Sequence, residues 1–136
     1  MTRPRPTVAV IDDDESVRES LPDLLRELGF SVHAFASAEE FLEFDAIATI
    51  RCLVIDVAMS PMSGLDVHAE LKRRGYDIPI VFISGHLDDA LRRLVLDQCG
   101  AECLSKPFTD TALLAAISAV LGLHGADETA RNGGKP

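Results

Sequence analysis

Carboxylates collect at two points of the sequence, each directly after a run of apolar residues. The stretch VAVIDDDE at 8–15 passes from four apolar residues to three aspartates and a glutamate, and the stretch CLVID ends at Asp56. If Asp12, Asp13 and Asp56 meet in the fold, two carboxylates about 5 Å apart repel by roughly 3 kcal/mol at an effective dielectric constant of ~20. Such a cluster must bind protons or be neutralised by cations.

One lysine and a metal ion are the cations that could neutralise this cluster. Lys106 lies in CLSKPF, just after another apolar run, and Ser84 closes a further run, PIVFIS. Lys106 supplies one positive charge, and a divalent metal is the natural second cation. An all-oxygen, water-accessible site favours Mg²⁺ over Zn²⁺. We therefore expect a magnesium site at Asp12, Asp13 and Asp56, with Lys106 and Ser84 beside it.

Aspartates that follow strands can also have a simpler role, which is to cap the helices that come next. We expect this role for Asp14, which stands immediately before a helical pattern. For Asp12, Asp13 and Asp56, the coincidence with Ser84 and Lys106 at other strand ends favours a binding site over capping.

Apolar runs of strand length alternate with amphipathic stretches along the chain. The expected strands lie at 7–11, 31–34, 51–55, 79–83 and 101–104. The expected helices lie at 15–28, after the capping box of Ser37 and Glu40, at 64–74, at 87–99 and at 110–121. This alternation predicts an α/β fold, in which a parallel sheet is covered by helices on both faces.

The expected strands and helices also predict where the candidate site residues lie. Right-handed crossovers bring the C-terminal ends of parallel strands to one edge of the sheet. Ligands of open α/β sheets bind at that edge, where the strand order reverses. Because each candidate residue comes at or just after the end of an expected strand, we expect all of them to converge there: Asp12, Asp13, Asp56, Ser84 and Lys106.

Length and composition indicate one domain that does not bind nucleic acid. The chain has 136 residues, of which 47% are hydrophobic, and this is enough for a single well-buried core. Its net charge of −9 repels nucleic acid, and its close arginine pairs are interpreted as solvated helix faces. Residues 124–136 are polar and glycine-rich, so we expect a domain over 1–123 followed by a disordered tail or linker.

The cysteines and the apolar runs indicate a cytoplasmic protein. Cys52, Cys99 and Cys103 are odd in number and show no metal-ligand spacing, which suits a reducing compartment. The longest apolar runs have strand length, so neither a signal peptide nor a membrane span is visible. We expect no contact with a membrane.

Four motifs, in this order and spacing, resemble the receiver domain of bacterial two-component response regulators. They are IDDD, the segment around Asp56, ISG and KPF, and the resemblance covers roughly residues 6–122. The stretches FASAEEFL, ISGH and SKPF are most similar to receivers of nitrogen-fixation regulators. The resemblance implies a single flavodoxin-like domain with five helices and the strand order 2-1-3-4-5, which is the order of the chemotaxis receiver.

The resemblance also implies a reaction. Asp56 would accept a phosphoryl group from the histidine of a sensor kinase or a phosphotransfer protein. Lys106 would pair with the phosphoryl oxygens, and Ser84 would donate its hydroxyl to them. The protein would catalyse its own phosphorylation and dephosphorylation as a signalling switch, and it would not be a turnover enzyme.

The same resemblance implies the ligands of the metal. Asp13, Asp56 and the backbone carbonyl of Ala58 would bind Mg²⁺ directly, and Asp12 would act mainly through a water molecule. The ion would neutralise the oxygens of the group in transfer.

One departure from the family concerns how phosphorylation is read. Cys103, three residues before Lys106, stands where the family has an aromatic switch residue, and it has too little volume for that role. We therefore expect the signal to leave through residues 85–89 and the helix beginning at Leu87. That helix, the last strand and the last helix form the face that the family commonly uses for dimers, so a phosphorylation-dependent homodimer is expected.

Two other functions stay open. A degenerate receiver would only bind partner proteins, although none of the five site residues is missing here. An aspartate-nucleophile phosphatase needs a second acid two residues after its nucleophile, where this chain has Ala58. The chain stops soon after the last expected helix, so we expect a stand-alone regulator or the receiver part of a longer one.

Overall fold

The computed structural model of this chain describes residues 6–12, 14–57, 62–85, 88–99 and 102–122. Within this part, five parallel strands form one sheet in the order β2-β1-β3-β4-β5. The strands are β1 (Thr7–Ile11), β2 (Ser31–Phe35), β3 (Cys52–Asp56), β4 (Ile80–Ser84) and β5 (Glu102–Ser105). The predicted fold class and strand order are confirmed.

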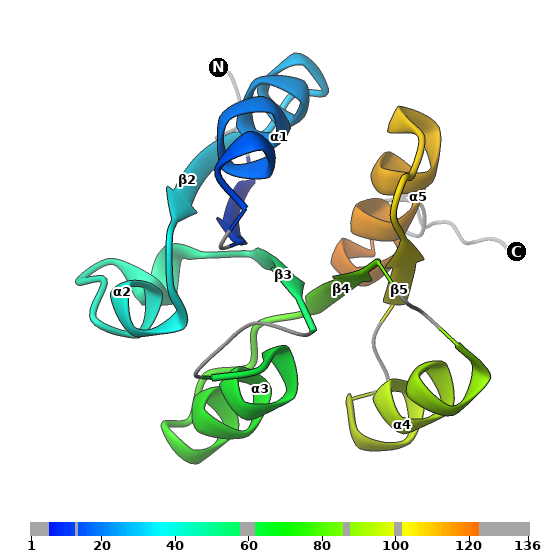
Figure 1. Ribbon diagram of the computed structural model, residues 1–136. Helices are drawn as coiled ribbons and strands as arrows, with labels where there is room; N and C mark the ends of the chain where they lie inside the picture. Colours follow the sequence, from blue (N-terminus) through cyan, green and yellow to red (C-terminus); the bar gives the residue numbers. More distant parts are fainter. Residues whose placement is uncertain (1–5, 13, 58–61, 86–87, 100–101, 123–136) are drawn as a thin grey trace, which may run out of the picture.

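Helices cover both faces of this sheet, as the sequence predicts. They are α1 (Glu15–Glu27), α2 (Ala38–Leu42), α3 (Gly64–Arg73), α4 (Asp89–Cys99) and α5 (Asp110–Leu121), with a short 3₁₀ helix, η1 (Ile47–Thr49), that the sequence did not predict. In Figure 1, α1 and α5 lie on one side of the sheet, and α2, α3 and α4 lie on the other.

Alternating side chains of the inner strands divide the core into two halves. In β3, Leu53 and Ile55 pack with the α2, α3 and α4 side, whereas Cys52 and Val54 pack with the α1 and α5 side. Because both faces of an inner strand are covered, its positions are apolar except at strand ends (Thr7, Asp56 and Ser84), and these strands appear in the sequence as hydrophobic runs.

Four strands, β2 to β5, end one residue further along the chain than the sequence pattern predicts, and for β3 and β4 that last residue is a candidate site residue. Asp56 pairs with Ile83 of β4, and Ser84 pairs with Ser105 of β5, so each belongs to the ladder. The two polar residues are therefore the last residues of their strands. Their backbones are held by the sheet itself.

Side-chain caps determine where several helices begin. Asp14 accepts a hydrogen bond from the Ser16 amide at 2.9 Å, which is the capping role expected for it. Ser37 accepts a hydrogen bond from the Glu40 amide at 3.1 Å, which is one half of the predicted capping box. These bonds are local, and local patterns predict them well.

The start of α4 differs from the prediction. The expected start, Leu87, lies outside the described residues, and the described helix begins at Asp89. The physical reason is a cap, because the Asp88 side chain accepts a hydrogen bond from the Leu91 amide at 2.8 Å.

Candidate functional site

Two acidic residues lie side by side at the C-terminal edge of β1 and β3. Ile11 and Ile55 are partners in this parallel pair, so Asp12 and Asp56 are the next residues on two adjacent strands. Asp12 is completely buried, whereas 15% of the Asp56 side chain is exposed. The approach of these two carboxylates was predicted from the strand ends.

Lys106 bridges the two carboxylates. Its Nζ lies 2.9 Å from Oδ2 of Asp56 and 3.2 Å from Oδ2 of Asp12. The backbone N–H of Lys106 donates a hydrogen bond to the carbonyl oxygen of Ser84 at 2.8 Å, and this bond ties the segment after β5 to the end of β4. One ammonium group thus neutralises part of the acidic cluster.

Asp12 is held in an environment that disfavours its charge. Burial raises the pKa of this carboxyl above its ordinary value of 3.8, and the nearby charge of Asp56 acts in the same direction. A hydrogen bond from the Asp14 amide to Oδ1 at 2.8 Å, together with the contact to Lys106, offsets this effect only in part. Asp12 therefore carries its charge at a cost, mainly because it is buried.

The charge of Lys106 is favoured by the same contacts. Burial alone would lower the pKa of this ammonium group, but its hydrogen bonds and attraction to Asp56 and Asp12 outweigh burial and raise the pKa above 10.5. Lys106 stays protonated at neutral pH.

Ser84 lies at the same edge as the carboxylates. It is the last residue of β4, directly after the residue that pairs with Asp56, and it is only 4% exposed. The structure therefore brings four of the candidate residues to one edge of the sheet: Asp12, Asp56, Ser84 and Lys106. The other two candidates, Asp13 and Ala58, lie outside the described residues.

Arg18 is a residue of this region that the sequence analysis missed. Its Nη1 donates a hydrogen bond at 3.0 Å to the backbone carbonyl oxygen of Asp12. The available signal was its place in the second turn of the helix that directly follows the acidic stretch. The partner is a carbonyl group, however, and residue types alone do not indicate such a contact.

The donor set is suitable for a hard divalent cation. Two carboxylates and one ammonium group leave a net charge of −1 among the described side chains of the cluster, before Asp13 is counted. Carboxylate oxygens are the ligands that Mg²⁺ prefers. Within the described residues, no three His, Cys, Asp or Glu side chains are grouped closely enough to hold a metal, so the set fits only together with Asp13 or backbone oxygens.

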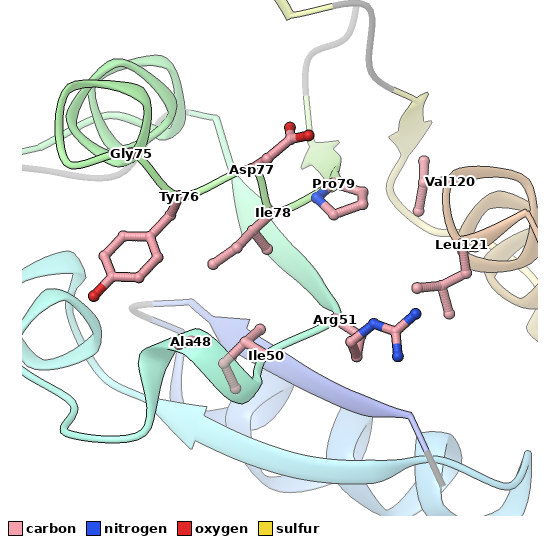
Figure 2. Close-up of a pocket in the computed structure, with 10 residues that line it drawn as sticks. All are labelled: Ala48, Ile50, Arg51, Gly75, Tyr76, Asp77, Ile78, Pro79, Val120 and Leu121. Atoms are coloured by element: carbon pink, nitrogen blue, oxygen red, sulfur yellow. The ribbon is translucent and has the colours of Figure 1, made fainter.

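A pocket of about 390 Å³ lies at the opposite edge of the sheet. It is lined by residues that precede β3 and β4 and by the last turn of α5, among them Arg51, Tyr76, Asp77 and Leu121 (Figure 2). Because parallel strands begin at this edge, the pocket is separated by the length of the strands from Asp12 and the other candidate residues. It does not contribute to their chemistry.

The comparison with protein families decides the identity of the domain. The family model of the response regulator receiver domain matches residues 8–118. This chain belongs to that family. It is a receiver domain of two-component signalling. The candidate site residues identified at the strand ends all lie within the matched range.

Similar proteins include response regulators and transcriptional regulatory proteins. Over 116 residues the receiver is 42% identical to the response regulator protein TodT of Pseudomonas putida, covering 85% of this chain and 51% of TodT. It is 43% identical to nodulation protein W of Bradyrhizobium diazoefficiens over 112 residues, covering 82% and 49% of the two chains. It is 40% identical to FixJ of Azorhizobium caulinodans over 128 residues, covering 92% and 61%.

Solved structures agree with this assignment. The receiver superposes on the crystal structure of FixJ-N with a TM-score of 0.77 and 34% identity, covering 90% of this chain and 96% of that one. It matches the response regulator StyR with a TM-score of 0.78 and 42% identity, covering 93% and 64%.

The chain spans about half the length of the first curated relatives that it matches. In the described part of the receiver, no helix has the length and apolar character needed to cross a membrane.

Proposed function

We propose that this receiver is switched by phosphorylation of Asp56 in a Mg²⁺-dependent reaction. The supporting observation is the contact of Lys106 with both Asp56 and Asp12 at the C-terminal edge of the sheet. This arrangement holds a carboxylate nucleophile beside a fixed cation, in a site that needs further positive charge.

The reaction forms a bond between an Asp56 carboxylate oxygen and phosphorus. The bond between phosphorus and a histidine nitrogen of the donor breaks, and the electron pair of that bond stays on the nitrogen. The donor is a sensor histidine kinase or a phosphotransfer protein. Lys106 orients Asp56 beforehand and pairs with the phosphoryl oxygens afterwards, and the Ser84 hydroxyl donates a hydrogen bond to them.

Asp13, Asp56 and the backbone carbonyl of Ala58 would hold the Mg²⁺, with Asp12 acting through water. When bound, the ion supplies positive charge to the oxygens of the transferred group. The buried Asp12 carboxylate is held by Lys106 at Oδ2 and by the Asp14 amide at Oδ1.

The output surface in this proposal is the face made by α4, β5 and α5. On α4, Leu94 and Leu96 are 40% and 54% exposed, and they are the exposed large hydrophobic residues of the described part. The two residues are two positions apart and do not share one face of the helix, so they form no single apolar patch, and the support for this surface is the family resemblance. We assign this face to a phosphorylation-dependent homodimer.

Incubation with acetyl phosphate and Mg²⁺, followed by intact mass measurement, tests this function. We expect one phosphoryl adduct that base removes, no adduct in Asp56→Asn, and a normal adduct in the control Asp23→Asn, which changes an exposed residue of α1. Hydrolysis of the phosphate donor without an adduct would indicate a phosphatase. No reaction would indicate a receiver that only binds partners, and a normal adduct in Asp56→Asn would refute the assignment of the phosphoacceptor.

A further inference from the structure

The contact between Arg18 and Asp12 links α1 to the acidic end of β1. Nη1 of Arg18 lies 3.0 Å from the carbonyl oxygen of Asp12, six residues earlier in the chain. The guanidinium group therefore reaches back past the N-terminal end of its own helix, whose cap is Asp14. Its partner is the backbone at the candidate site, so the contact is more than a surface ion pair.

This contact completes the restraint of Asp12. The Oδ1 atom of Asp12 accepts a hydrogen bond from the Asp14 amide, its Oδ2 atom contacts Lys106, and its carbonyl oxygen accepts from Arg18. The carbonyl group belongs to the peptide that joins Asp12 to Asp13. Arg18 therefore holds the peptide that leads into a residue which the proposed magnesium site requires.

We propose that Arg18 is a positioning residue for the magnesium site, and this inference rests on the proposed function. Arg18 acts through the Asp12 carbonyl and does not touch the metal or the phosphoryl group. Removing a residue that orients a metal ligand typically weakens metal binding by about 10- to 100-fold. Loss of Arg18 should reduce Mg²⁺ affinity within this range.

Charge and positioning predict opposite results for Arg18. A guanidinium group near a cation site repels Mg²⁺, so if its charge were its main effect, removing it would tighten Mg²⁺ binding. If it positions the acidic turn, removing it weakens binding although a repelling charge is lost. The sign of the change in affinity therefore separates the two roles.

The test compares Arg18→Met, Arg18→Lys and the control Arg26→Met. Arg26 lies on the same helix, and its Nη1 atom lies 3.4 Å from Oδ1 of Asp23 at the surface. Titration with MgCl₂, followed by calorimetry or amide NMR well below the melting temperature, should show roughly tenfold weaker binding in Arg18→Met. Arg18→Lys keeps the charge and a donor and should recover part of the loss, and Arg26→Met should bind as wild type does.

Phosphorylation by acetyl phosphate at fixed, subsaturating Mg²⁺ gives a second readout. Arg18→Met should react more slowly, and raising the Mg²⁺ concentration should restore most of the rate. Unchanged or tighter Mg²⁺ binding in Arg18→Met would overturn the inference, including the case in which only the melting temperature falls. If wild type itself neither binds Mg²⁺ nor forms an adduct, the proposed function fails instead.

Discussion

The ring of Phe82 fills the space that a side chain at Gly64 would need. A Cβ atom at Gly64, the first residue of α3, would lie 2.8 Å from Cε1 of Phe82 and 3.2 Å from Cα of Val57. The Gly64 amide also donates a hydrogen bond to the carbonyl oxygen of Val57 at 3.0 Å. This close approach anchors the start of α3 beside the end of β3, and therefore beside Asp56.

Gly64→Ala should destabilise the fold because Phe82 is completely buried and cannot move away freely. Overpacking of this kind costs about 1–3 kcal/mol in the free energy of unfolding, which urea denaturation measures. Gly85→Ala is the matched control, since a Cβ atom there meets nothing within 4 Å. Equal stabilities of the two variants would contradict the steric reading of Gly64.

Asp12→Asn should stabilise the metal-free protein at neutral pH. The folded pKa of Asp12 is raised, so below about pH 4 the carboxyl is protonated in both states and imposes no charge-burial cost. As pH rises through the folded pKa, the buried group becomes charged and stability is lost. Asparagine removes this loss, and we expect about 1 kcal/mol, or roughly 4 °C in Tm, in EDTA at pH 7.5.

The pH dependence of Asp12→Asn provides the control. The difference in Tm from wild type should be near zero at pH 4 and should grow as pH rises, whereas Asp23→Asn, at an exposed site, should show no such trend. If Asp12→Asn melts below wild type in EDTA at pH 7.5, the charge of Asp12 does not destabilise the fold and this interpretation is refuted.

Lys106→Met should destabilise the metal-free protein, because it leaves Asp12 buried without its ammonium partner. Breaking a fully buried pair costs roughly 3–5 kcal/mol, and since Lys106 is partly exposed we expect about 1–3 kcal/mol. Saturating Mg²⁺ should recover part of this loss by binding the folded state. Thermal melts with and without MgCl₂ measure both effects, and Lys72→Met, on α3, is the control. A loss no larger than that of the control would contradict the bridging role.

Cys103→Ser should leave the conformational signal intact. Cys103 pairs with Phe82 across β4 and β5 and is half-buried against the core under α2, α3 and α4, so it is a packing residue in our interpretation. Amide NMR shifts with and without beryllofluoride, a phosphoryl mimic, should show large changes at 84–92 in both wild type and Cys103→Ser. If the substitution erases these changes, Cys103 is itself the switch.

Local sequence patterns predict most of the helices and strands. Helix starts at Asp14 and Ser37 depend on hydrogen bonds between residues two or three positions apart, and a sequence displays such pairs directly. The three inner strands, β1, β3 and β4, appear as apolar runs because they are covered on both faces. The start of α4 was misplaced because Asp88 and Asp89 are adjacent and either could cap a helix, and only the structure shows that Asp88 accepts the capping hydrogen bond.

The sequence by itself determined which residues could do chemistry. It also determined that they lie at strand ends, on the same edge of the sheet. Strand order was not contained in the pattern and came from the family resemblance. Tertiary structure alone decided that Lys106 contacts both Asp56 and Asp12, a residue 94 positions away, and that Arg18 reaches the Asp12 carbonyl. The physical reason is that such contacts depend on strand register and side-chain direction, which only the packing of the whole domain determines.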